Sequence, residues 1–177
     1  MQKLKGFTLI EVLIATAVIA LGIVASYVVV QQIFAYSFAT SYRLTAAYLA
    51  KEGIEIVRNI RDTGWIQELA WNNNGLFSGY WQADYSHTTV LLPCLFCNGT
   101  SNDFNNDLFF WYLKYPIAGN PFYRYSLFGS KSLFKRRIRI QRPTADSIKA
   151  TVDVMWKERG VIKSLTVEGD LYDWRYK

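Results

Sequence analysis

The sequence predicts an α+β protein in which one long N-terminal helix packs on a C-terminal antiparallel β-sheet. Two observations support this fold class. An apolar and then an amphipathic helical pattern run without a break from about residue 7 to residue 61. Near the C-terminus, apolar and polar residues alternate with the period of two that half-buried strands show. The length of 177 residues suits one globular head and one membrane element.

The first element is an apolar run from Phe7 to Val30, which the basic residues Lys3 and Lys5 precede. As a helix these 24 residues span roughly 36 Å at 1.5 Å per residue. That length exceeds the hydrocarbon core of a bilayer, which is about 30 Å thick. We therefore expect the run, residues 7–30, to cross a membrane once, with the two lysines holding the N-terminus in the cytoplasm.

A plain membrane anchor does not explain three positions at the start of this run. Gly6 ends the basic segment, Phe7 follows it, and Glu11 lies five residues after the glycine. A carboxylate inside a membrane-spanning segment costs about 2.5–3.5 kcal/mol on insertion scales, so Glu11 is a candidate functional residue. The stretch KGFTLIE, residues 5–11, resembles the class III signal of type IV pilins and type II secretion pseudopilins.

The resemblance implies that residues 1–6 are a leader, which a prepilin peptidase removes by cutting after Gly6. A glycine has no side chain and leaves the backbone open to the protease. The resemblance further implies that the same peptidase methylates the new amino group of Phe7. The resemblance also implies that Glu11 neutralises the Phe7 amine of a neighbouring subunit during filament assembly.

Further partners and a location follow from the same resemblance. The implied partners are other pilin or pseudopilin subunits, the inner-membrane assembly platform and membrane lipid. The implied location is the cytoplasmic membrane, with a single pass, a cytoplasmic N-terminus and an extracytoplasmic head. After assembly the subunit would lie in a pilus or pseudopilus filament.

Other hypotheses for the N-terminus stay open. Residues 15–17, Ala-Thr-Ala, match the A-x-A pattern of a secretory signal peptide, but they lie inside the apolar run, and cleavage normally follows it. An uncleaved single-pass membrane protein with an extracytoplasmic binding head explains the run but not Gly6 or Glu11. Glu11 taken alone also fits a tolerated charge near the lipid headgroups.

The helical pattern continues as an amphipathic segment, residues 31–63. Its expected apolar stripe has members three or four residues apart: Leu44, Ala47, Ala50, Ile54, Val57 and Ile60 or Arg61. Asp62-Thr63-Gly64 predicts a stop, with Gly64 just past the helix end. Gly22 and Gly53 are expected weak points, at which the helix bends or melts locally.

Residues 64–130 have no sustained periodicity and are rich in turn signals, so we expect an irregular, loop-rich region with short strands near 88–92 and 108–113. Within it, Cys94 and Cys97 form a C-x-x-C. In an exported head a disulfide is favoured, and free thiols or a metal or redox site are the alternatives.

Residues 103–107 place oxygen-bearing side chains at alternate positions, like the start of a calcium loop. Leu108 stands where an EF-hand needs glycine, and Lys114 stands where it needs glutamate, so an EF-hand is excluded. A polar turn is favoured over an irregular calcium site.

Residues 131–177 are expected to form an antiparallel sheet of at least three strands and, with residues 31–130, one globular head. Apolar residues recur at every second position from Ala150 to Trp156, a turn follows at 157–160, and a return strand follows the turn. Phe134, Ile138 and Ile140 indicate the strand before this hairpin. The apolar face of the sheet needs a cover, which the amphipathic helix can provide.

A basic run lies on the first of these strands: Lys131, Lys135, Arg136, Arg137, Arg139 and Arg142. Contact with DNA phosphates is one hypothesis, and it would make the chain a DNA-binding minor pilin of an uptake system. We favour a solvated strand face, since basic residues also discourage edge pairing. The net charge of +6 falls to +4 without the two leader lysines, too little to imply nucleic acid by itself.

The sequence argues against catalysis. A single histidine, His87, excludes a His-rich metal site, and the sequence contains no nucleophile–base pair, phosphate-binding loop or complete metal set. We therefore expect no enzymatic activity, cofactor or metal. The favoured interpretation is a structural subunit of a type IV pilus-like or type II secretion pseudopilus filament.

Overall fold

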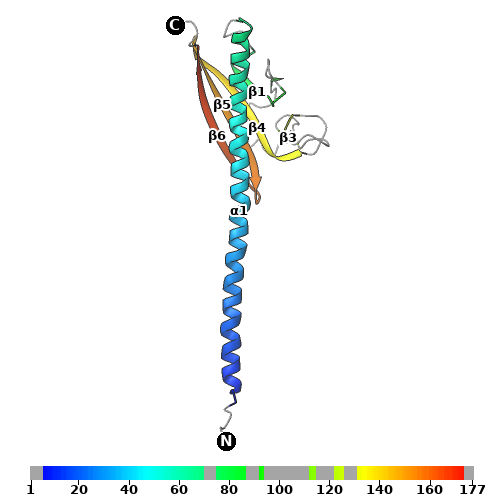
Figure 1. Cartoon of the computed structure of the whole chain (residues 1–177), viewed down its shortest axis with the longest axis vertical. Coiled ribbons are helices and arrows are strands. Elements are labelled where there is room, and N and C mark those ends of the chain that lie inside the picture. The colour runs from blue at the N-terminus through cyan, green and yellow to red at the C-terminus, as the bar shows by residue number, and fades with distance from the viewer. Residues whose placement is uncertain are drawn as a thin grey trace. The chain divides into compact units, whose positions relative to one another are not determined.

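The computed structural model describes residues 6–69, 75–86, 92–93, 112–114, 122–125 and 131–173. It confirms the α+β class, with one long helix, α1 (Leu9–Ile66), and a six-stranded antiparallel sheet. The chain divides into two compact units, Met1–Ser41 and Tyr42–Lys177. The first unit holds the N-terminal part of α1, and the second holds the rest of α1 and the strands that the structure describes (Figure 1).

The described part of the first unit is helical from Leu9 onward and exposes nearly all its apolar side chains. The helix continues through Gly22 without interruption, so the expected weak point there does not break it. A Cβ atom at Gly22 would meet nothing within 4 Å. No packing among the described residues of this unit therefore requires a glycine at this position.

The second unit is built on three long strands, β4 (Lys131–Thr144), β5 (Ser147–Glu158) and β6 (Val161–Tyr172). Consecutive strands pair antiparallel, as the alternation predicts. Three short strands complete the sheet: β1 (Gly79–Gln82), β2 (Leu92–Pro93) and β3 (Tyr112–Lys114). The order is β2-β1-β4-β5-β6, and β3 also pairs with β4.

The turn between β5 and β6 lies where the sequence predicts it. Glu158 pairs with Val161, so only Arg159 and Gly160 form the loop. Their φ angles are 50° and 84°. Two consecutive positive φ angles are typical of the type I′ turn, whose twist matches that of the flanking strands.

One face of the sheet packs on α1 in the second unit (Figure 1). The register pairs Ile138 with Val152 and Ile140 with Ala150, and all four side chains are buried. Gly53 of α1 lies directly over Val152, since a Cβ atom at Gly53 would lie 2.8 Å from Val152 Cγ1. Gly53 is therefore not the expected weak point but a position at which helix and sheet approach closely.

The predicted apolar stripe is right in its C-terminal part and wrong at its start. Ala50, Ile54, Val57 and Ile60 are buried, but Leu44 is 56% exposed and Ala47 is also exposed. The buried face begins instead with Ala46 and Leu49. Ala46 and Leu49 also follow the 3.6-residue period of a helix. They lie on a face that is rotated around the helix axis from the predicted start of the stripe.

The end of α1 also differs from the prediction, because the helix passes through Gly64 and ends at Ile66. The amide of Leu69 donates to the carbonyl of Gly64 at 3.0 Å, and that of Glu68 donates to the carbonyl of Trp65 at 3.2 Å. Glu68 has a φ of 56°. This pattern is a Schellman cap with glutamate at the left-handed position that glycine usually occupies.

Candidate processing and assembly site

Gly6 and Phe7 form an open, non-helical segment before α1. Neither residue lies in regular structure, and a Cβ atom at Gly6 would meet nothing within 4 Å. The side chain of Phe7 is 82% exposed. The backbone between these two residues is therefore accessible in the unit that contains it, as a proteolytic cleavage site requires.

Thr8 caps the first turn of α1. Its hydroxyl oxygen accepts a hydrogen bond from the Glu11 amide at 3.3 Å, and its carbonyl accepts one from the Val12 amide at 3.2 Å. A threonine followed three residues later by glutamate is the pattern of a capping box. Glu11 thus lies in the first turn, where the positive end of the helix dipole favours a carboxylate.

The carboxylate of Glu11 makes no ion pair with any residue that the structure describes. The side chain is exposed, on a helix whose surrounding residues are apolar. An ionised carboxylate in an apolar environment is unfavourable without a partner. A partner from outside the described chain, such as a free amino group, would remove this cost.

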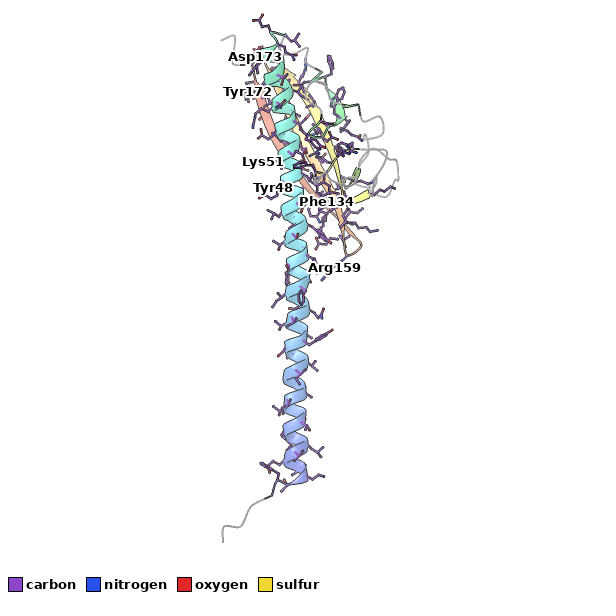
Figure 2. All side chains as sticks on the ribbon, turned by 45° about the vertical axis from the view of Figure 1, so that its right-hand side comes forward. Tyr48, Lys51, Phe134, Arg159, Tyr172 and Asp173 are labelled. Carbon is purple, nitrogen blue, oxygen red and sulfur yellow. The ribbon has the colours of Figure 1, made fainter. Side chains whose placement is uncertain are left out.

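The helix from Leu9 to Val30 has a surface that fits membrane anchoring. The helix Leu9–Ile66, to which it belongs, contains an 18-residue window with a mean hydropathy of 2.6. No residue of that window is buried. Its apolar side chains stand out from the ribbon along its length (Figure 2). The hydroxyls of Thr16 and Ser26 donate to the carbonyls of Leu13 and Gly22, at 3.0 and 2.8 Å. These polar groups are therefore satisfied within the helix, as a lipid environment demands.

These features define the chain as an α+β head with an exposed apolar N-terminal helix that fits membrane anchoring. Residues 1–27 match the family model described as "Prokaryotic N-terminal methylation motif". The chain therefore carries the signal of type IV pilin and pseudopilin precursors, which confirms the family resemblance of its N-terminus. Searches of curated proteins and of solved structures found no match.

The second unit, which forms the head, contains a buried ionic cluster that the sequence predictions above do not include. Arg136 of β4 is fully buried, and its Nη1 donates to Glu52 Oε2 at 2.9 Å and to the Leu49 carbonyl at 2.8 Å. Its Nη2 donates to the Ala83 carbonyl at 2.6 Å. One guanidinium thus joins β4, α1 and the segment that follows β1.

Tyr125 extends this cluster through the backbone carbonyl of Arg136. The Tyr125 hydroxyl donates to the Arg136 carbonyl at 2.5 Å, and the Tyr125 amide donates to Asp84 Oδ2 at 2.9 Å. Asp84 Oδ1 accepts from the amide and the hydroxyl of Ser86, at 2.9 and 2.5 Å. The cluster therefore fixes the segment around Tyr125 to the segment after β1.

Burial and charge act in opposite directions on the cluster. Burial raises the pKa of the Tyr125 phenol to about 12, although the charge of Arg136 lowers it. Burial lowers the pKa of the Arg136 guanidinium, but Tyr125 and Glu52 raise it by more, so this pKa stands above its ordinary value. Arg136 therefore stays charged and the Tyr125 hydroxyl stays protonated as a hydrogen-bond donor.

The interpretation of the basic run as a solvated face is wrong for Lys135 and Arg136, which are 1% and 0% exposed. Arg137 Nε donates to Asp153 Oδ2 at 2.8 Å, and the Arg142 guanidinium donates to the Leu76 carbonyl at 2.8 and 3.0 Å. These four cations are therefore used in internal contacts or buried, and the run does not form one continuous exposed basic face.

Several sequence predictions lie outside the described residues. These are the candidate disulfide between Cys94 and Cys97, the calcium-like stretch 103–107 and the single histidine His87. The leader residues 1–5 lie outside them as well. Of the two expected strands in the middle region, only the ends appear among the described residues, as β2 and β3.

Proposed function

We propose that this chain is a structural, non-catalytic subunit of a type IV pilus-like or type II secretion pseudopilus filament. A prepilin peptidase would cut it after Gly6 and methylate the amino group of Phe7. The mature helix would then pack against the helices of other subunits. The observation that carries the proposal is the match of residues 1–27 to the methylation motif.

The geometry of the N-terminus supports this role. The segment at Gly6 and Phe7 is open, the helix that follows exposes apolar side chains, and Glu11 has no ion-pair partner among the described residues. An exposed apolar helix gains from burial first in lipid and then against other helices. Packing between different faces of identical subunits propagates as a fibre when its rotation does not close into a ring.

The proposal includes a route through the membrane. Lys3 and Lys5 would keep the leader in the cytoplasm, where the peptidase and the inner-membrane assembly platform act, and the head would lie outside the cytoplasm. The competing hypothesis is an uncleaved single-pass membrane protein with an extracytoplasmic binding head. The two hypotheses differ in one covalent bond, the peptide bond between Gly6 and Phe7.

Reconstitution of the assembly system tests the proposal. The full-length precursor is expressed with a prepilin peptidase, an assembly ATPase and a platform protein, and the cells are sheared. We expect the processed chain in the sheared filament fraction and unprocessed chain in the membrane when the peptidase is omitted. Recovery of the chain only in the membrane, uncut in both cases, would support the competing hypothesis.

A further inference from the structure

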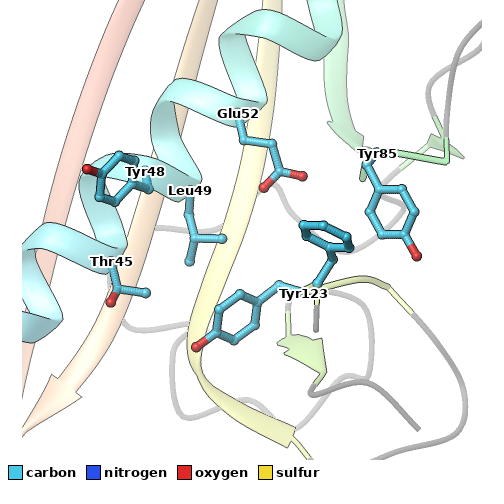
Figure 3. A pocket seen from close by; sticks show the side chains of 7 residues that line it. Thr45, Tyr48, Leu49, Glu52, Tyr85 and Tyr123 are labelled. Atoms are coloured by element: carbon cyan, nitrogen blue, oxygen red, sulfur yellow. The ribbon is translucent and has the colours of Figure 1, made fainter. Parts of the chain in front are cut away.

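A pocket of about 510 Å³ lies in the head, and the proposed function does not use it. Its walls include four aromatic side chains, one aliphatic side chain and one carboxylate: Tyr48, Tyr85, Phe122, Tyr123, Leu49 and Glu52. Figure 3 shows the Glu52 carboxylate directed from α1 toward the aromatic side. The volume lies within the range of pockets that hold small organic groups.

The wall chemistry favours a cation. The faces of aromatic rings carry negative electrostatic potential and attract ammonium and guanidinium groups. The ring centroids of Tyr85 and Phe122 are 5.5 Å apart, and the two ring planes meet at 55°. The rings are therefore tilted toward each other and not stacked flat. Among the described residues that line the pocket there is no lysine or arginine, and Glu52 is the charged one.

The contacts of Glu52 point the same way. Arg136 engages only the Oε2 atom of Glu52, and no described residue donates to Oε1. The Glu52 side chain keeps 32% of its surface exposed. A carboxylate oxygen that accepts from no described residue disfavours an anion in the pocket and favours a cation.

We propose that this pocket binds an arginine or lysine side chain presented by a neighbouring protein chain. The cationic group would contact the Glu52 carboxylate and the ring faces. Leu49 and the edges of the rings would cover the aliphatic stem, as apolar surfaces do for long basic side chains. Tyr48 lines the pocket and is exposed, so a partner can reach the pocket from this side. The proposal does not depend on leader cleavage or on filament formation.

Direct binding to the full chain in detergent micelles tests the proposal. The probes are the tripeptide N-acetyl-Gly-Arg-Gly-amide and its matched analogue with citrulline, which has the same shape without the charge. We expect the arginine peptide to bind at least about tenfold more tightly than the citrulline peptide, because the charge makes the contacts with the carboxylate and the rings. A lysine peptide should also bind. Equal binding of the arginine and citrulline peptides, or no binding of either basic peptide, would overturn the proposal.

Variants locate the binding in the pocket. Glu52→Gln should weaken the arginine peptide about tenfold, and Tyr85→Leu should weaken it severalfold while keeping the Glu52–Arg136 pair. Glu55→Gln is the matched control, since Glu55 lies one turn away on α1, is exposed and pairs with Arg58 at 2.6 Å. Unchanged binding in Tyr85→Leu, or equal loss in Glu55→Gln, would contradict the site. Tighter binding of choline than of the arginine peptide would make a free small cation, not a protein side chain, the ligand.

Discussion

Arg136 Nη1 lies 2.9 Å from Glu52 Oε2 and joins the middle of β4 to α1 across 84 residues of sequence. The guanidinium has no exposed surface, whereas the Glu52 side chain keeps 32% of its own. Two backbone carbonyls, those of Leu49 and Ala83, accept its other hydrogen bonds. A single buried charge is thus shared by the three segments that surround it.

Removal of this charge should destabilise the head strongly. In Arg136→Met, Glu52 would lose its ion-pair partner and two carbonyls would lose a donor. Breaking a buried pair from one side costs about 3–5 kcal/mol, so we expect a loss of that size in the free energy of unfolding. Denaturant unfolding of the detergent-solubilised chain, followed by tryptophan fluorescence, measures it.

The exposed pair between Arg58 and Glu55 provides the control. Its side chains are 45% and 48% exposed, so Arg58→Met should change the free energy of unfolding by less than about 1 kcal/mol. The double variant Arg136→Met with Glu52→Leu should recover part of the loss, since no unpaired carboxylate remains. Equal effects of Arg136→Met and Arg58→Met would show that the buried pair does not hold the head together.

The raised pKa of Tyr125 predicts a pH dependence of stability. Burial raises this pKa from 10.0 to about 12 in the folded chain, so the unfolded chain loses the proton first as the pH rises. The contribution of Tyr125 is complete below pH 10 and is lost between pH 10 and pH 12. Its size is about 2–3 kcal/mol for a shift of this extent.

Tyr125→Phe isolates this effect from the other groups that titrate at high pH. We expect the variant to be less stable at pH 8, because the bond to the Arg136 carbonyl is absent. The difference between the two chains should then shrink from pH 10 to pH 12. Unfolding curves measured across this range in both chains would refute the account if the difference stayed constant.

Gly53→Ala should destabilise the head although alanine is the better helix former. Its Cβ atom would lie 2.8 Å from Val152 Cγ1, a contact that β5 or α1 must move to relieve. Overpacking of this kind typically costs about 1–3 kcal/mol, against a gain in helix propensity of about 1 kcal/mol. Thermal unfolding of the head reports the net loss.

Val152→Ala offers the complementary change. The double variant Gly53→Ala with Val152→Ala should lose less free energy of unfolding than the sum of the two single losses. The smaller side chain at position 152 makes room for the new Cβ atom at position 53, which in turn fills the space that valine leaves. Gly22→Ala serves as a further control, since beyond the neighbouring backbone of its own helix the new Cβ atom would meet no described atom within 4 Å, and the head should unfold at the same temperature. Strict additivity of the two head changes would mean that the close contact has no energetic weight.

Replacement of Glu11 should impair filament incorporation without impairing membrane insertion. The charge and the helix cap can be separated, because glutamine at this position keeps the capping pattern with Thr8 but not the charge. If the charge pairs with the amine of a neighbouring subunit, both Glu11→Ala and Glu11→Gln should reduce the sheared filament fraction. Normal incorporation of Glu11→Gln would assign the residue to the cap instead.

The N-terminal signal could be predicted from sequence because every part of it is local. Gly6, Phe7, Thr8 and Glu11 lie within six residues of one another, and the helix cap joins Thr8 to Glu11. The alternation of apolar residues also predicts the β5–β6 hairpin correctly, since neighbouring strands with a two-residue turn have few other pairings.

The buried cluster could not be predicted in the same way, because its members come from distant segments. Arg136 lies 84 residues from Glu52 and 11 residues from Tyr125. The hydrogen bond between Tyr125 and Asp84 joins residues that are 41 positions apart. One signal does exist. Arg136 lies two and four residues before Ile138 and Ile140. Alternate residues of a strand line the same face, so this spacing places Arg136 on the core face. Grouping the cations as one run hides this alternation.

The mass of the mature N-terminus tests the central claim most directly. The full-length chain is expressed with and without a prepilin peptidase, and the N-terminal peptide is identified by mass spectrometry. The account predicts that with the peptidase the chain begins at Phe7, with a methyl group on its amine, and that without it the chain keeps residues 1–6. A chain that retains Met1 in the presence of an active peptidase would contradict the account.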